Sequence, residues 1–124
     1  MTSVRTSLEP SLTSVGAARR FVRDVLITRQ VDGSVVDVVE LLTSEVVTNA
    51  LLHARSAEEL VVELHASCVR VAITDSSCDW PVRRSIEPDA VSGRGIAIVD
   101  ALAHAWGVDP ISEGGKRVWF EVVR

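Results

Sequence analysis

One segment of the chain carries its clearest signal: EVVTNALLHA, residues 45–54. Its apolar residues recur at three- and four-residue steps, which predicts an amphipathic helix. At 100° per residue, Glu45, Asn49 and His53 stack one above the other on the side expected to face the rest of the protein. The apolar residues expected on that side, packing on a sheet, are Val38, Leu42, Val46 and Leu52.

A carboxylate, an amide and an imidazole are unusual in an apolar stripe, because each costs a few kcal/mol when it is buried without a partner. Taken singly, each of the three could be a core polar group that bonds to the backbone. Three in register indicate a cavity for a polar ligand or ion. Glu and Asn are hard oxygen ligands that suit Mg²⁺, and Glu45 could alternatively act as a general base.

The remaining chain predicts strands and helices on either side of this segment. The sequence has no repeat, low-complexity tract or linker, so residues 1–124 are expected to form a single domain. The predicted strands and helices are grouped rather than strictly alternating. This favours an α/β fold, a two-layer sandwich of a mixed, mainly antiparallel sheet with helices on one face. In chain order we expect a strand over 4–8, helices over 13–30 and 34–54, a hairpin of strands over 60–64 and 69–73, a helix over 93–105, and strands over 106–108 and 117–123.

Two further features are candidate parts of a site. Asp75 follows the strand over 69–73 and begins a polar loop, residues 76–92, whose length is typical of functional or disordered loops. Its carboxylate could accept a hydrogen bond from a ligand amine, or it could cap the turn that follows. Gly93-Arg94-Gly95 is expected to open the next helix, whose N-terminus would offer free N–H groups to a phosphate.

Composition excludes several classes of protein. The chain has 124 residues, 47% of them hydrophobic and 24% charged, with a formal net charge of −4. Mild acidity argues against direct nucleic-acid binding. No apolar run approaches the roughly 18 residues of a membrane span. Without a secretory signal, and with cysteines that fit no disulfide framework or zinc motif, the chain is expected to be cytoplasmic.

The charge is distributed unevenly along the sequence. Residues 1–30 are basic and residues 31–66 are acidic. Arg19, Arg20 and Arg23 could form a basic patch for an acidic protein partner, or they could simply be part of a solvated helix face.

Together, these residues resemble the GHKL ATP-binding superfamily, and in particular its anti-sigma-factor serine kinases and the small ATP-binding regulators of actinomycetes. The resemblance covers Ser7 to Val123. The N box corresponds to residues 45–54, the G1 aspartate to Asp75, and the G2 box to residues 93–96. The tail over 106–108 and 115–120 is similar to the actinomycete branch. The two glycines of the family's G1 box are absent, since Asp75 is followed by Ser-Ser-Cys-Asp, and Arg117 replaces a frequent threonine.

The resemblance implies the Bergerat fold and a set of residue roles. Asn49 would hold Mg²⁺ at the phosphates, and Glu45 would be the general base. Asp75 would receive the adenine amino group, and His53 would lie near the ligand. The G2 residues that would shape the phosphate turn are Gly93, Arg94 and Gly95.

The resemblance also implies a function. The protein would be a regulator that binds ATP or ADP, with protein serine/threonine kinase activity toward an anti-anti-sigma protein of the STAS type. It would also bind a sigma factor, and it could form a homodimer. The alternative is a non-catalytic interaction module of the same fold, with weak or no ATP binding.

Overall fold

The computed structural model describes residues 1–54, 57–76, 91–111 and 114–124. Most of the expected loop over 76–92 therefore lies outside the described residues. In chain order the elements are β1 (Thr2–Ser7), α1 (Thr13–Thr28), α2 (Gly33–Asn49), the π-helical turn η1 (Ala50–Ala54), β2 (Glu59–Leu64), β3 (Cys68–Asp75), α4 (Val91–Leu102), β4 (Ala105–Pro110) and β5 (Lys116–Val123).

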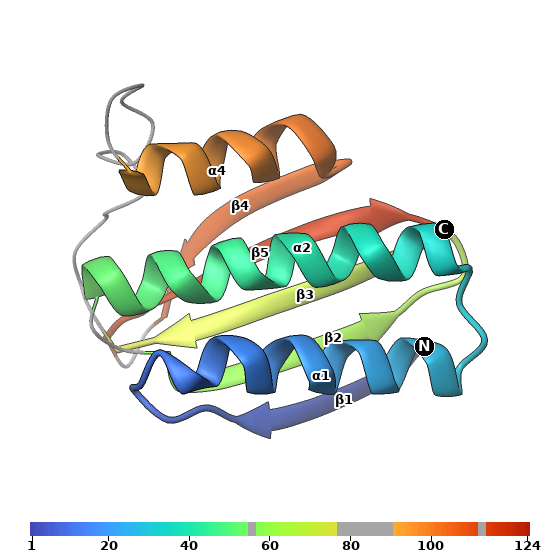
Figure 1. Cartoon of the computed structure of the whole chain (residues 1–124), viewed down its shortest axis with the longest axis horizontal. Coiled ribbons are helices and arrows are strands. Elements are labelled where there is room, and N and C mark those ends of the chain that lie inside the picture. The colour runs from blue at the N-terminus through green and yellow to red at the C-terminus, as the bar shows by residue number, and fades with distance from the viewer. Residues whose placement is uncertain (55–56, 77–90, 112–113) are drawn as a thin grey trace.

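The strands form one five-stranded sheet in the order β1-β2-β3-β5-β4 (Figure 1). All four pairings are antiparallel. β3 lies at the centre, and the register of its pairing with β5 sets Asp75 opposite Lys116. The last residue of β3 and the first of β5 therefore meet at the same end of the sheet.

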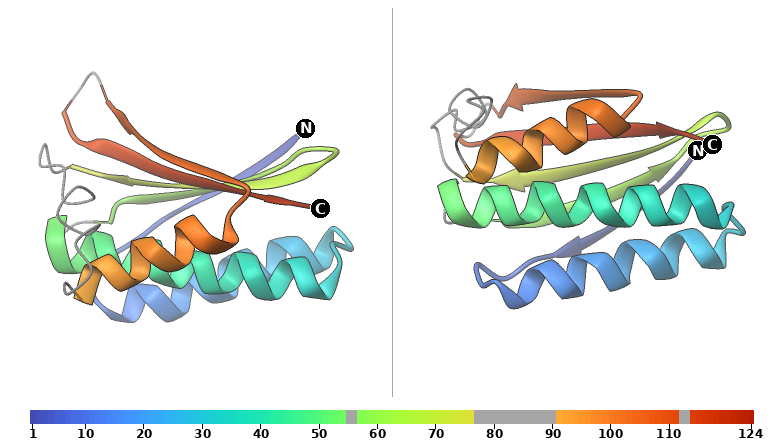
Figure 2. Two further views of the ribbon diagram at one scale, coloured as in Figure 1. Left: turned by 90° about the horizontal axis from the view of Figure 1, so that it is seen from above. Right: turned by 45° about the horizontal axis from the view of Figure 1, so that its top comes forward.

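The described helices cover one face of this sheet and leave the other open, as the view from above shows (Figure 2). α2 contacts both β3 and β5 and is flanked by α1 and α4. The predicted α/β sandwich with its helices on one face is confirmed, and the described sheet is wholly antiparallel rather than mixed. Among the residues the structure describes, no helix is long and apolar enough to cross a membrane.

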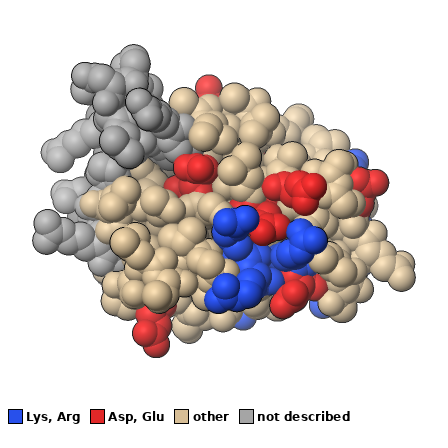
Figure 3. Space-filling view, viewed as in Figure 1, with Lys and Arg blue, Asp and Glu red and all other residues tan. Residues whose placement is uncertain are grey.

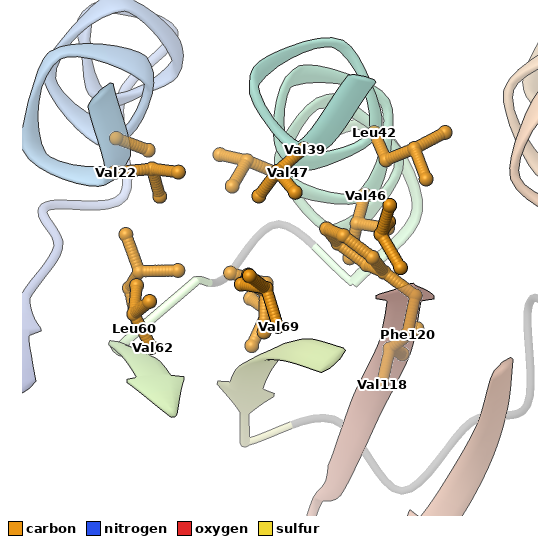
Figure 4. Close-up of a cluster of buried hydrophobic side chains, with 14 of the residues drawn as sticks. Val22, Val39, Leu42, Val46, Val47, Leu60, Val62, Val69, Val118 and Phe120 are labelled. Atoms are coloured by element: carbon orange, nitrogen blue, oxygen red, sulfur yellow. The ribbon is translucent and has the colours of Figure 1, made fainter. Parts of the chain in front are cut away.

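The core lies between the two layers (Figure 4). Val22 of α1 and Val47 of α2 point toward Leu60, Val62 and Val69 of the sheet, and all five side chains have no solvent exposure. Each such side chain contributes roughly 1.5–3 kcal/mol of transfer free energy on burial. This continuous apolar contact fixes α2 over the middle of the sheet and thereby determines where the C-terminal end of α2 lies.

The helix over 34–54 is interrupted where the prediction kept it regular. α2 ends at Asn49, and the chain continues as the π-helical turn η1. In a π-helix the hydrogen bonds run from residue i to i+5, so a 100° projection no longer holds. Leu52, expected on the sheet, is accordingly 52% exposed, and that prediction is wrong. α4 begins at Val91, two residues before the predicted Gly93.

Candidate functional site

Four chain segments converge at one end of the sandwich. The C-terminus of α2, the end of β3, the start of β5 and the N-terminus of α4 lie together at the left in Figure 1. Three of these segments carry a residue that the sequence marked as functional: Asn49, Asp75 and Gly93. The fold thus places together residues that are far apart in the sequence.

Asp75 is the most buried acidic side chain among the described residues, with 1% exposure. Alternation along β3 turns Val71, Ile73 and Asp75 toward the helices. The polar end of the strand therefore lies under the helical layer, where apolar residues would otherwise continue the core. A buried carboxylate needs a partner, because an isolated charge is strongly destabilising there.

Lys116 is that partner. Its Nζ donates a hydrogen bond to Asp75 Oδ1 at 3.0 Å and lies 3.0 Å from Oδ2. Lys116 itself is 2% exposed. Removing one member of such a pair leaves an uncompensated charge in the core, at a typical cost of 3–5 kcal/mol.

Gly115 brings the backbone of the turn against this pair. Its φ is +95°, in the region that favours glycine. A Cβ at this position would overlap with the Asp75 carbonyl oxygen and would lie 3.0 Å from Ser76 Cα. Only a glycine allows the start of β5 to pass this close to the end of β3.

Glu45 and Asn49 occupy successive turns of α2. Asn49 is 5% exposed and therefore belongs to the buried stripe, as predicted. Glu45 is only half-buried, at the border of that stripe. It lines a surface depression of about 530 Å³ together with Leu41, Ser44 and residues of α1. The Glu45 carboxylate therefore remains in contact with solvent, at a depression whose lining does not include Asn49 or Asp75.

For the other predicted site residues, the structure gives the secondary-structure element in which each one lies. His53 lies in η1, one turn beyond Asn49. Gly93, Arg94 and Gly95 lie in the first turns of α4 rather than ahead of it. Because helix N-termini present free N–H groups, this end of α4 is suited to an anion.

A magnesium ion would find one hard oxygen ligand here, the amide of Asn49. This fits Mg²⁺, which commonly takes one or two protein oxygens and completes its shell with phosphates and water. In the described ranges, no group of three or more His, Cys, Asp or Glu side chains is arranged to hold a metal ion.

The predicted basic patch is largely neutralised within the chain. Arg19 donates hydrogen bonds to Glu40 at 3.2 and 3.3 Å, and Arg23 bonds to the same carboxylate at 3.1 Å. Arg23 also lies 3.8 Å from Asp37. In Figure 3 the blue side chains form a patch that is bordered by red ones. These contacts favour the interpretation of a solvated face that joins the two helices.

Gly115 and Lys116 were not among the predicted site residues. The sequence over 115–120 indicates a similarity to the actinomycete branch, but it assigns no site role to Gly115 or Lys116. The informative signal is the strand register, because aligning β3 antiparallel to β5 sets Lys116 opposite Asp75.

The comparisons with known proteins agree with this fold. A family model described as the histidine kinase-like ATPase domain matches residues 8–122. The chain therefore belongs to the histidine kinase-like ATPase domain family, which confirms its resemblance to the GHKL superfamily.

Two solved structures share the fold. The RsbU and RsbW domains of Rv1364c from Mycobacterium tuberculosis match over 100% of this chain and 33% of that one, with a TM-score of 0.74 and 18% identity. This chain thus spans about a third of that relative. A chain from the SiaB–SiaC complex of Pseudomonas aeruginosa matches over 100% of this chain and 90% of that one, with a TM-score of 0.57 and 13% identity. No curated protein sequence matches the chain.

Proposed function

We propose that this protein is an ATP-binding regulator with protein serine/threonine kinase activity, folded as a single domain over residues 1–124. The observation that carries the proposal is the meeting of a buried carboxylate, Asp75, with the Asn49 end of α2 and the N-terminus of α4. A base-binding acceptor, a magnesium ligand and an anion-binding helix end are the parts that such a reaction needs.

Each residue has a distinct role in this mechanism. Asp75 accepts a hydrogen bond from the adenine amino group, while the N-terminal turn of α4, with Gly93, Arg94 and Gly95, faces the phosphates. Asn49 would hold Mg²⁺, which would neutralise phosphate charge, and His53 would lie beside the ligand. Glu45 takes the proton from an acceptor serine as its oxygen attacks the γ-phosphorus and ADP leaves.

The partner classes follow from the same family. The SiaB–SiaC complex is an example of this fold found with a second protein. We propose an anti-anti-sigma protein of the STAS type as the phosphate acceptor and a sigma factor as the regulated partner, both in the cytoplasm. A homodimer of this chain would be the acting form.

Calorimetric titration with ATP and ADP, each with and without Mg²⁺, tests the nucleotide site. We expect magnesium-dependent binding that is lost in Asn49→Ala. Thr48→Ala, a change of the half-buried neighbour on α2, is the matched control and should bind as the parent does. No heat and no thermal stabilisation at millimolar ATP would contradict the proposal.

The role of Glu45 is tested separately, by transfer of labelled phosphate from ATP to a STAS-type protein. Glu45→Ala should retain ATP binding and lose transfer by a factor on the order of 10²–10⁴, as expected for a general base. Equal transfer by variant and parent would rule out this role.

A non-catalytic interaction module is the second candidate. It is favoured by the sequence after Asp75, where Ser77 and Asp79 replace the two glycines of the family's G1 box. Partner binding that is unchanged by ATP and by Glu45→Ala would support it. Reproducible transfer that depends on Glu45 would exclude it.

A further inference from the structure

Lys116 is the only lysine in a chain that otherwise uses arginine for its basic side chains. It is also the one described basic residue that is almost completely buried. Its flexible side chain carries a compact charge, which lies close to both oxygens of one carboxylate inside the core. Its Nζ lies 3.0 Å from Oδ1 and 3.0 Å from Oδ2 of Asp75.

The ammonium group determines the protonation state of its partner. A carboxyl group with 1% exposure would become neutral if it stood alone, because burial disfavours the charged form. Next to a cation it stays ionised. An ionised carboxylate only accepts hydrogen bonds, whereas a protonated carboxyl also donates one.

This difference matters for the choice of base. The 6-amino group of adenine donates hydrogen bonds, while the 6-oxo group of hypoxanthine accepts them. A carboxylate fixed in its ionised form attracts the first and repels the second. A neutral carboxyl can turn its O–H toward an oxo group and would tolerate both.

We propose that Lys116 is a specificity-determining residue of the nucleotide site, which selects a 6-amino over a 6-oxo purine by keeping Asp75 an acceptor. The inference rests on the proposed function, because it concerns the same pocket. Lys116 acts through Asp75 and does not itself contact the base. Gly115 supports the selection by holding the backbones of the two strands together at this point.

The test compares the dissociation constants of ATP and inosine triphosphate, measured by calorimetry with Mg²⁺. The parent protein should prefer ATP by about tenfold or more, the factor of about one hydrogen bond. In Lys116→Met the preference should fall to within about threefold, mainly through weaker ATP binding. Arg5→Met is the control, since this exposed residue lies on β1, two strands away from β3, and should keep the parent's ratio.

Lys116→Met could unfold the protein, so two milder variants accompany it. Lys116→Arg retains a cation and should retain the preference for ATP. Lys116→Gln retains a hydrogen-bond donor without the charge and should lose the preference for ATP. Near-ultraviolet circular dichroism verifies that each variant is folded.

The outcomes separate the two hypotheses. A parent that binds neither nucleotide overturns the proposed function. A parent that prefers ATP, with the same ratio in folded Lys116→Met or Lys116→Gln, overturns the role of Lys116 and leaves the nucleotide site intact.

Discussion

The candidate site brings two strands into close contact at three residues: Gly115, Lys116 and Asp75. Gly115 has a backbone that only glycine adopts easily, and the next residue, Lys116, neutralises the carboxylate of Asp75. The turn supplies both the close approach and the charge. The site therefore depends on the shape of the backbone as much as on side-chain chemistry.

Substituting Gly115 tests this dependence. Gly115→Ala places a methyl group against the Asp75 carbonyl oxygen at a positive φ, so we expect a loss of at least about 2 kcal/mol in the free energy of unfolding. Urea denaturation measures it. Gly33→Ala, where a Cβ would meet nothing within 4 Å, should change stability by less than about 1 kcal/mol. Equal effects of the two substitutions would contradict this account.

The sequence predicted part of this site and missed the rest for a physical reason. Asp75 and Asn49 were recognised because each lies at a definite place on a strand or helix. The partner of Asp75 follows it 41 positions later, after α4 and β4. Only the register of two strands connects such residues, and a local pattern contains no register.

At the scale of elements, the C-terminal cap of α1 is conformationally strained, whereas the N-terminal cap of α2 is not. α1 ends in a Schellman motif, in which Val31 N donates to Leu26 O at 3.0 Å and Gln30 N to Ile27 O at 2.9 Å. Gln30 is left with φ of 60°, which is unfavourable for a residue with a Cβ. α2 begins with a well-formed cap, since Asp32 Oδ1 accepts from Ser34 N at 2.9 Å.

Gln30→Gly should stabilise the protein by about 1 kcal/mol, because the left-handed backbone is already present and glycine adopts it without strain. Differential scanning calorimetry would show a Tm higher by a few degrees. Gln30→Ala keeps the Cβ and should leave the Tm close to that of the parent. A lower Tm for Gln30→Gly would mean that the glutamine side chain stabilises the turn.

The cap of α2 predicts a pH dependence. Hydrogen bonds from the side chain and backbone of Ser34 lower the pKa of Asp32. A carboxyl whose folded pKa is below its unfolded value stabilises the fold above the unfolded pKa, and that stabilisation is lost as pH falls through the folded pKa. Between pH 6 and pH 3 the urea midpoint of the parent should therefore fall further than that of Asp32→Asn. Parallel curves for the two proteins would contradict the prediction.

The sequence was most informative about the secondary-structure elements. The order of helices and strands, the hairpin and the amphipathic face of α1 follow from periodicity, because these patterns depend on neighbouring residues. The π-helical turn η1 was not predicted, since no local signal distinguishes EVVTNALLHA from a regular helix. Its wider turn changed the position of Leu52 relative to α2.

At the scale of the whole molecule, the described sheet has one buried and one open face. The open face carries paired charges, such as Arg70 with Glu121 at 3.1 Å, and Arg70 lies 4.3 Å from the ring centroid of Trp119. The indole ring lies against Gly107, where a Cβ would approach to 2.8 Å. These contacts cover the sheet without a second helical layer.

Adjacent valines of β2 test this one-sided core. Val62 has no exposure and points toward the helices, whereas Val61 is half-buried on the open face. Val62→Thr should cost about 1–3 kcal/mol because its hydroxyl is buried without a prepared partner. Val61→Thr should cost less than about 1 kcal/mol. Chemical denaturation compares the two, and equal losses would show that both faces are buried.

The central pairing of β3 with β5 has a consequence for the order of folding. The first two-thirds of the chain contains β1, α1, α2 and the β2–β3 hairpin. β5 comes later and pairs with β3, although 41 positions separate Lys116 from Asp75. Long-range pairings close large loops and are kinetically slow. In a chain growing on the ribosome, the candidate site is therefore incomplete until β5 has been synthesised and has paired with β3.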